Sequence, residues 1–177
     1  MKINTSCPVL VTGATGYIAG WVVKNLLDKG ITVHAPIRNL SNKGKRAHLD
    51  ELAENSSGQI KYFESDLLIK NSYKEAMEGC ELVIHTASPF VMDSKDPQKE
   101  VIDPALIGTQ NVLKTVNEVD SVKRVVLTSS VAAIYGNGVD AQSVDGGIFN
   151  ESMWNTTSTA TDGEYSYSKT IAEKEAW

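Results

Sequence analysis

The chain has 177 residues, and its 41% hydrophobic content is enough for one compact domain with a hydrophobic core and too high for a disordered chain. Its 17 basic and 22 acidic side chains give a net charge of -5, and the basic residues form no long run that would follow a nucleic-acid backbone. The apolar run near the N-terminus is far too short to span a bilayer and no signal-peptide core precedes it, so we expect a cytoplasmic protein that binds neither nucleic acid nor a membrane.

The first 65 residues alternate between short apolar runs and helical patterns. The run "CPVLVT" (7–12) leads into glycine, as a buried parallel strand does. From Gly16 to Lys29 the apolar residues recur at the spacing of one helix face, and Gly30 supplies a stop. The same reasoning predicts a strand at 31–37, a helix at 43–54 and a strand at 60–65.

The alternation continues to residue 130. We predict a short helix around 72–78, a strand at 81–87, a long helix from about 95 to 119 and a strand at 122–130. Pro104 is expected to kink the long helix or to lie near its start, because proline donates no backbone hydrogen bond. Strands that alternate with helices predict a doubly wound α/β fold, a Rossmann-type parallel sheet flanked by helices, in one domain over residues 1–177.

Residues 136–163 break this pattern, because they are rich in Gly, Asn, Ser, Thr and Asp and hold few large apolar residues. A loop of this length inside a compact domain is usually functional or mobile. The alternative is a plain disordered excursion. We favour a functional segment, because both the strand before it and the helix after it carry polar groups suited to chemistry.

The stretch "VTGATGYIAG" places Gly13 and Gly16 between the first strand and the first helix, with Ala19 three residues on. Gly13 permits a tight turn, Gly16 lets the backbone approach a pyrophosphate, and Ala19 allows the helix to pack closely on the strand. Phosphates would then lie at the positive end of the helix dipole. Glycine turns also occur for purely geometric reasons, but this position favours a dinucleotide site.

The end of the second predicted strand distinguishes between nicotinamide cofactors. An NAD site usually places an Asp or Glu there, whereas the 2′-phosphate of NADP needs a cation. The sequence has Arg38 at this point, followed by Lys43, Lys45 and Arg46, with no acid near. The pattern favours NADP, with Arg38 as the first phosphate ligand and Lys45 as the second, while at least one of these cations is expected simply to face solvent.

Near the end of the chain, "YSYSK" (165–169) combines two tyrosines with one lysine. In a helix, residues four apart share a face and residues two apart do not. Tyr165 is therefore expected to pair with Lys169, and Tyr167 to serve packing or the surface. The two cysteines, Cys7 and Cys80, and the three scattered histidines form no metal-ligand pattern, so we expect buried thiols, no disulfide and no metal.

Five motifs occur in an order that resembles one enzyme superfamily, namely "TGATGYIAG" at 12–20, "SDL" at 65–67, "HTASPF" at 85–90, "RVVLTSS" at 124–130 and "YSYSK" at 165–169. With them the chain is similar to an extended short-chain dehydrogenase/reductase. It most resembles the dihydroflavonol-4-reductase-like group, near the methylglyoxal and aldehyde reductases. Members of that group are usually much longer, so the resemblance implies that the chain corresponds to an N-terminal half, with the C-terminal substrate region missing.

The resemblance implies a site for NADP(H) and a carbonyl substrate. It places Gly13, Gly16, Tyr17 and Ile18 at the pyrophosphate, Arg38 and Lys45 at the 2′-phosphate, Asp66 and Leu67 beside the adenine, and Thr86, Ala87 and Ser88 on the nicotinamide side. It places Ser130, Tyr165 and Lys169 in the catalytic group, with Ser129 as a weaker rival to Ser130. In plant dihydroflavonol reductases an asparagine five residues after the catalytic serine helps to hold the flavonoid. Tyr135 stands there in this chain, which argues against a flavonoid substrate.

Reduction of a ketone or aldehyde needs a hydride at carbon, which the cofactor supplies, and a proton at oxygen. Tyr165 would be the acid, with Lys169 lowering its pKa, and Ser130 would donate a hydrogen bond to the same oxygen. The alternatives are a nucleotide-binding module without catalysis, one half of an enzyme made from two polypeptides, and an incomplete product whose exposed sheet edge promotes aggregation. A sugar-nucleotide epimerase ranks lower, because such enzymes usually favour NAD. The sequence leaves the oligomeric state open, a homo-oligomer included.

Overall fold

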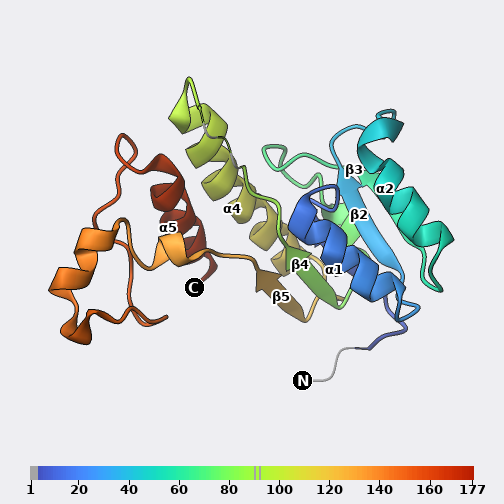
Figure 1. Ribbon diagram of the computed structural model, residues 1–177. Helices are drawn as coiled ribbons and strands as arrows, with labels where there is room; N and C mark the ends of the chain where they lie inside the picture. The colour runs from blue at the N-terminus through green and yellow to red at the C-terminus, as the bar shows by residue number, and fades with distance from the viewer. Residues whose placement is uncertain (1–3, 90, 92) are drawn as a thin grey trace. The chain divides into compact units, whose positions relative to one another are not determined.

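The computed structural model describes residues 4–89, 91 and 93–177, and its centre is a five-stranded parallel sheet (Figure 1). The strands lie in the order β3-β2-β1-β4-β5, so β3 and β5 are the two edges. Their bounds are Val9–Thr12 for β1, Val33–Ile37 for β2, Ile60–Glu64 for β3, Leu82–His85 for β4 and Arg124–Leu127 for β5. Every residue of β1 and β2 is buried, which explains why both runs are mainly apolar, with Thr12 and His34 as buried polar exceptions.

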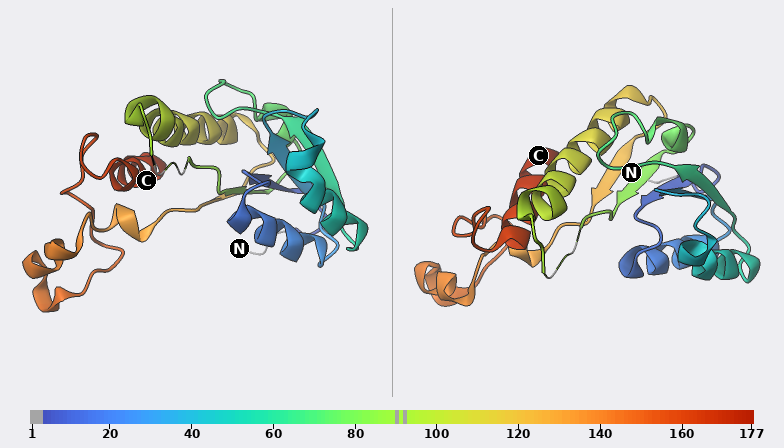
Figure 2. Two further views of the ribbon diagram at one scale, coloured as in Figure 1. Left: turned by 45° about the horizontal axis from the view of Figure 1, so that its top comes forward. Right: turned by 90° about the horizontal axis from the view of Figure 1, so that it is seen from above.

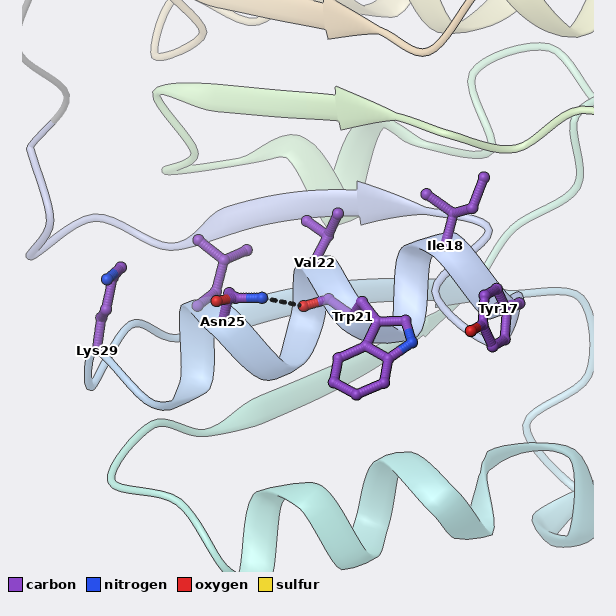
Figure 3. Close-up of a pocket in the computed structure, with 7 residues that line it drawn as sticks. Tyr17, Ile18, Trp21, Val22, Asn25 and Lys29 are labelled. Carbon is purple, nitrogen blue, oxygen red and sulfur yellow. Dashed lines mark hydrogen bonds between the residues drawn. The ribbon is translucent and has the colours of Figure 1, made fainter.

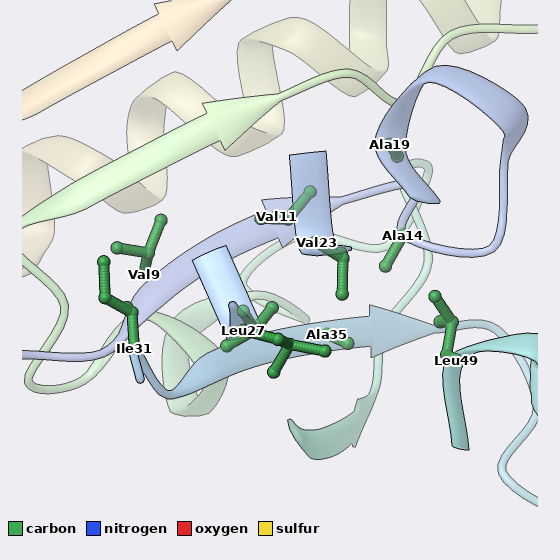
Figure 4. Packing of buried hydrophobic residues seen from close by; sticks show 10 residues of the cluster. Val9, Val11, Ala14, Ala19, Val23, Leu27, Ile31, Ala35 and Leu49 are labelled. Atoms are coloured by element: carbon green, nitrogen blue, oxygen red, sulfur yellow. The ribbon is translucent and has the colours of Figure 1, made fainter. Parts of the chain in front are cut away.

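Two helices cover one face of the sheet, α1 (Tyr17–Leu27) and α2 (Lys43–Glu54), as Figures 1 and 2 show. Ala19, Val23 and Leu27, four residues apart, form the buried side of α1. They pack on Val9 and Val11 of β1, on strand β2 and on Leu49 of α2 (Figure 4). Helix α2 begins after Asn42, whose side chain accepts a hydrogen bond from the Lys45 backbone at 3.2 Å and caps the helix.

The opposite face is covered by the short helix α3 (Lys74–Met77) and by the C-terminal part of α4 (Asp103–Glu118). The core there joins Leu10 of β1, Val83 of β4, Met77 of α3 and Val112 of α4, all fully buried. Because successive strand residues point to opposite faces, Val9 and Leu10 serve different cores. The sheet is thus covered on both faces, as a doubly wound fold requires.

The long helix predicted at about 95–119 consists of two pieces. A π-helical turn, η1 (Gln98–Ile102), comes first and α4 follows directly. The Asp103 backbone N–H donates to the Gln98 carbonyl, five residues back, and Pro104 is the second residue of α4. Proline has no N–H to donate to the preceding turn, so it fits the start of a regular helix and not its interior.

The packing divides the chain into two compact units, residues 1–87 with 111–128, and residues 88–110 with 129–177. The first holds the sheet with α1, α2, α3 and the C-terminal half of α4. The second holds η1, the N-terminal half of α4, three 3-10 helices and the last helix, α5 (Glu164–Ala176). The 3-10 helices are η2 (Val131–Ala133), η3 (Gly138–Ser143) and η4 (Asp145–Gly147). The single domain expected over residues 1–177 stays a prediction.

The polar segment 136–163 is held by side-chain hydrogen bonds. Asp140 accepts from the backbone of Gly136 and Asn137 at 3.0 and 3.1 Å and from the Thr157 hydroxyl at 2.7 Å. These bonds hold the pKa of the Asp140 carboxyl below its usual value, with Thr157 the largest contributor. Asn155, which is buried, donates to the Ala132 carbonyl at 2.9 Å and so ties the segment to η2. The alternative interpretation of residues 136–163 as a plain disordered excursion is therefore wrong.

The strands and helices predicted from the sequence are confirmed, with ends that differ by a few residues. Cys80 is buried, which raises the pKa of its thiol to about 12, whereas Cys7 is only partly buried, contrary to expectation, because it lies ahead of β1. Among the described residues, none of the helices is long and apolar enough to cross a membrane, and His, Cys, Asp and Glu form no group able to hold a metal. The "F" of the motif "HTASPF", Phe90, lies outside the described residues.

Candidate active site

The turn after β1 has the geometry that a dinucleotide site needs. Gly13 has a φ of 67°, a left-handed conformation that side chains rarely adopt, and a Cβ atom added to it would lie 2.9 Å from the Ala87 Cα atom. A side chain at position 13 is therefore excluded twice, by backbone conformation and by the segment after β4. The Gly16 N–H donates to the Gly13 carbonyl at 2.8 Å and closes the turn.

Gly16 precedes α1, and the first residues of the helix are open to solvent. Tyr17 and Ile18 are 84% and 61% exposed, and no acidic side chain lies in the first turn of α1. The helix therefore presents unopposed N–H groups and the positive end of its dipole beside the glycine turn. The prediction that Gly13 and Gly16 approach a pyrophosphate agrees with this exposed helix start, and it stays a prediction.

Thr12, at the end of β1, joins the glycine turn to the segment after β4. Its hydroxyl oxygen accepts from the backbone N–H groups of Thr86 and Ala87 at 3.1 and 3.0 Å and lies 2.7 Å from His85 Nδ1. With both lone pairs used, the Thr12 hydroxyl donates to Nδ1, so neutral His85 carries its hydrogen on Nε2. The Thr86 hydroxyl donates to the Thr12 carbonyl as well. Thr86 and Ala87, predicted on the nicotinamide side, are thus brought together with Gly13.

Ser88 begins the second unit, and its hydroxyl is buried without a hydrogen-bond partner among the described residues. A buried hydroxyl that lacks a partner costs free energy, so this group is suited to a ligand. The absence of a hydrogen-bond partner for the Ser88 hydroxyl among the described residues agrees with the prediction that Ser88 binds the cofactor. This role of Ser88 stays a prediction.

The two cations predicted at the 2′-phosphate lie beyond the end of β2. Arg38 follows the last residue of β2 and is exposed, and Lys45 is exposed on the first turn of α2. Arg46, beside Lys45, is engaged elsewhere, with its guanidinium carbon 4.5 Å from the centre of the Tyr62 ring and its Nε 3.4 Å from Asp50. Arg38 and Lys45 therefore remain candidates for a phosphate, while Arg46 serves the packing of α2 on β3.

The turn "SDL" after β3 is held by hydrogen bonds from two directions. The Asp66 carboxylate accepts from the Leu68 backbone at 2.8 Å, and the Ser72 hydroxyl donates to the Asp66 carbonyl at 2.7 Å. The buried Asn111 of α4 donates to the Leu67 carbonyl at 2.7 Å. Asp66 and Leu67 are partly exposed, as residues that flank an adenine would be.

In the second unit the two serines after β5 make different contacts. The Ser129 hydroxyl donates to the Glu173 carboxylate on α5. The Ser130 hydroxyl oxygen accepts from the Ala132 backbone at 3.2 Å and caps η2, which leaves the Ser130 hydroxyl proton for another acceptor. Helix α5 packs against both η2 and η1, so the segment that Ser130 begins lies against the helix that carries Tyr165 and Lys169.

Helix α5 is confirmed where "YSYSK" predicts it, with Tyr165 partly buried near its start. Lys169 is only 6% exposed. Burial lowers the pKa of the Lys169 ammonium, because it removes water from the charged form, while the charge of Glu173 acts in the opposite direction. A buried lysine one turn from a tyrosine is an unusual arrangement and is characteristic of a functional site.

Sequence reasoning missed three residues of this region, Thr12, Asn111 and Glu173. Thr12 lies at the start of the quoted glycine motif, and a hydroxyl at a strand end was a signal for a contact with the neighbouring strand. Glu173 follows Lys169 by four residues, so helical spacing alone placed it on the same face. Asn111 carried no signal, because its partner Leu67 is 44 residues away in sequence.

The parallel sheet, the glycine turn and the helix with Tyr165 and Lys169 define a Rossmann-type protein of the short-chain dehydrogenase/reductase class. The model of the NAD dependent epimerase/dehydratase family matches residues 9–177. The chain belongs to this family.

Individual relatives are reductases. The chain is 44% identical to cinnamoyl-CoA reductase CAD2 of Medicago truncatula over 177 residues, which cover 98% of this chain and 53% of that protein. It is 35% identical to dihydroflavonol 4-reductase of Gerbera hybrida, covering 100% of this chain and 48% of that protein. The crystal structure of yeast methylglyoxal/isovaleraldehyde reductase Gre2, complexed with NADPH, matches with a TM-score of 0.78 and 28% identity over 96% of this chain and 52% of that chain.

These comparisons confirm the resemblance to dihydroflavonol-4-reductase-like proteins and to methylglyoxal reductases, and they confirm the fold class. The chain spans about half the length of the relatives that it matches.

Proposed function

We propose that the chain binds NADP(H) and takes part in the reduction of a ketone or aldehyde to an alcohol. The observation that carries this proposal is the pairing on α5 of Tyr165 with a buried Lys169. The glycine turn supports the cofactor, and the relatives support the class of reaction, since they are reductases and the Gre2 structure contains NADPH.

NADPH, when bound, supplies the hydride. Gly13, Gly16 and the N-terminus of α1 would hold the pyrophosphate, and Arg38 and Lys45 the 2′-phosphate. Asp66 and Leu67 would flank the adenine, and Thr86, Ala87 and Ser88 would lie on the nicotinamide side.

Tyr165 would donate its phenolic proton to the substrate oxygen as negative charge develops there. A free phenol has a pKa of about 10, so it needs a neighbouring cation to give up its proton near neutral pH. The ammonium of Lys169, one helical turn on, would be that cation.

Ser130 is a better hydrogen-bond donor to the substrate oxygen than Ser129. The Ser129 proton is already donated to Glu173, whereas the Ser130 oxygen accepts from Ala132 and keeps its own proton to donate. A developing oxyanion needs donors, so this difference in contacts supports Ser130 as the catalytic serine.

The test is a titration of the chain with NADPH and with NADH, followed by NADPH consumption with a panel of aldehydes and ketones. Tyr165→Phe should reduce turnover by about 10²- to 10⁴-fold, the usual worth of a general acid, and leave the affinity for NADPH nearly unchanged. Tyr167→Phe is the matched control and should keep turnover.

Two results would contradict the proposal. Equal loss of turnover in both tyrosine variants would make Tyr165 structural, and preference for NADH would remove the role of Arg38. Binding of NADPH without turnover by the unaltered chain would favour a nucleotide-binding fragment, or one half of an enzyme made from two polypeptides.

A further inference from the structure

Three residues on α5, spaced by four, share one face of the helix, namely Tyr165, Lys169 and Glu173. The first two belong to the proposed proton-transfer group, and the third has been assigned no role. Glu173 is partly buried at the other end of this face. Its carboxylate accepts the hydroxyl proton of Ser129, a charge-assisted hydrogen bond of the strong class.

The contact between Ser129 and Glu173 joins two parts of the proposed site that lie 44 residues apart in sequence. Ser129 is the neighbour of Ser130, and Glu173 is one helical turn from Lys169. A tether at this point holds the segment after β5 against α5, next to the groups that must act on one substrate oxygen. Small errors in such an alignment are costly for catalysis.

The charged groups of the described residues on η1 and η2, the elements that pack against α5, have other surroundings than Lys169. From η1 these groups are Lys99 and Glu100, and η2 supplies none. Lys99 is largely exposed and pairs with Asp96 at 2.9 Å, and Glu100 accepts from the Ser94 hydroxyl at 3.0 Å. The charge of Glu173 favours the ammonium form of Lys169 against the effect of burial.

We propose that Glu173 is a positioning residue of the reductase site, whose carboxylate ties Ser129 to the helix face of Tyr165 and Lys169 and supplies the negative charge beside the Lys169 ammonium. The inference rests on the proposed function for its meaning. Its two parts, tether and charge, are measurable in the chain without turnover.

Three variants separate the tether from the charge. Glu173→Gln keeps an oxygen that can accept the Ser129 proton but removes the charge. Ser129→Ala removes the tether and keeps the charge. Glu173→Ala removes both. The titration of the Lys169 ammonium is followed by NMR of ¹³C-labelled lysine, with Lys169→Met used to assign the signal, and stability is followed by thermal unfolding.

We expect the Lys169 titration midpoint to move to lower pH in Glu173→Gln and Glu173→Ala and to stay in place in Ser129→Ala. We expect Ser129→Ala to lower the melting temperature, and the double variant Ser129→Ala with Glu173→Ala to lose no more than Glu173→Ala alone, since both remove one contact. If the chain reduces carbonyls, Glu173→Gln should in addition shift the pH profile of turnover.

A midpoint that stays in place in Glu173→Gln would overturn the role of the charge. Losses of stability that add in the double variant would overturn the tether. Either result can be obtained whether or not the chain has reductase activity, so failure of this inference is distinct from failure of the proposed function.

Discussion

Arg38 is the residue on which we expect the choice between NADP and NAD to depend, because it is an exposed cation directly after β2 and no carboxylate follows it before α2. We expect Arg38→Gln to weaken NADPH binding by about 10- to 150-fold, since a hydrogen bond to a charged group is worth roughly 1.5–3 kcal/mol. The affinity for NADH, which has no 2′-phosphate, should change little. Fluorescence titration with both cofactors measures the difference.

Lys29→Gln is the control for Arg38, because it removes a similar charge at the far end of α1. A loss of NADPH affinity as large in Lys29→Gln as in Arg38→Gln would indicate a general effect of net charge and would contradict a specific phosphate contact.

The burial of Lys169 disfavours the charge that the proposed function requires of it. Burial lowers the pKa of its ammonium from the ordinary 10.5, because the unfolded state hydrates the charge better than the folded state does. Between the lowered pKa and 10.5 the unfolded chain binds more protons than the folded chain, so stability rises with pH in that window.

We therefore expect Lys169→Met to raise the melting temperature at neutral pH, by roughly 2–4 °C for each kcal/mol of relieved penalty, while abolishing any turnover. The gain should shrink as the pH rises through the lowered pKa and 10.5, because above 10.5 the lysine becomes neutral in both states. Thermal unfolding at several pH values measures it, with the exposed Lys114→Met as control. Destabilisation by Lys169→Met at neutral pH would show that the ammonium contributes more than its burial costs.

At the scale of elements, α1 has one side in the core and another that is apolar and open. Tyr17, Ile18 and Trp21 are 84%, 61% and 56% exposed, and they line a hollow of about 410 Å³ with Val22 and Leu26 (Figure 3). Strand β5, which belongs to the same compact unit as α1, also has an exposed apolar side chain. Its Val126 is 47% exposed and pairs in register with Ile84, which packs in the core beneath α1. Paired residues point to the same face of a sheet, so Val126 extends the apolar surface on the side of α1.

Exposed apolar surface of this kind promotes association. If the chain self-associates through this surface, Trp21→Gln should weaken the association by about tenfold or more, because burial of a large apolar side chain is worth roughly 1.5–3 kcal/mol. Sedimentation velocity over a range of concentrations measures the change. Ile148→Gln is the matched control, since Ile148 is 72% exposed but lies outside this surface, after η4. An equal effect of both substitutions would contradict a specific role of the α1 surface.

The element scale also shows why prediction succeeded for the strands and helices. Buried parallel strands such as β1 and β2 are mainly apolar, and α1 repeats its apolar residues every three or four positions, so both are evident in a linear pattern. The segment 136–163 has no such pattern. Its order comes from single polar residues, Asp140 and Asn155, whose partners cannot be inferred from composition.

At the scale of the whole molecule, cofactor binding should stabilise the chain, because a ligand that binds only the folded state adds to the free energy of unfolding. We expect NADPH at 100 times its dissociation constant to add about 2.7 kcal/mol, or roughly 5–11 °C in melting temperature for a chain of this size. NADH at the same concentration should give a smaller shift. Differential scanning fluorimetry measures both, and identical shifts would contradict selective binding of NADPH.

The sequence by itself determined the fold class, the position of nearly every strand and helix, and the placement of Tyr165 and Lys169 one turn apart on a helix, because these follow from local periodicity and from spacing within one helix. The tertiary structure alone decided the contacts between distant residues. It showed that Gly13 lies against Ala87, that Thr12 receives the N–H groups after β4, and that Ser129 is bonded to Glu173. Such contacts depend on how strands and helices pack, which leaves no regular trace along the chain.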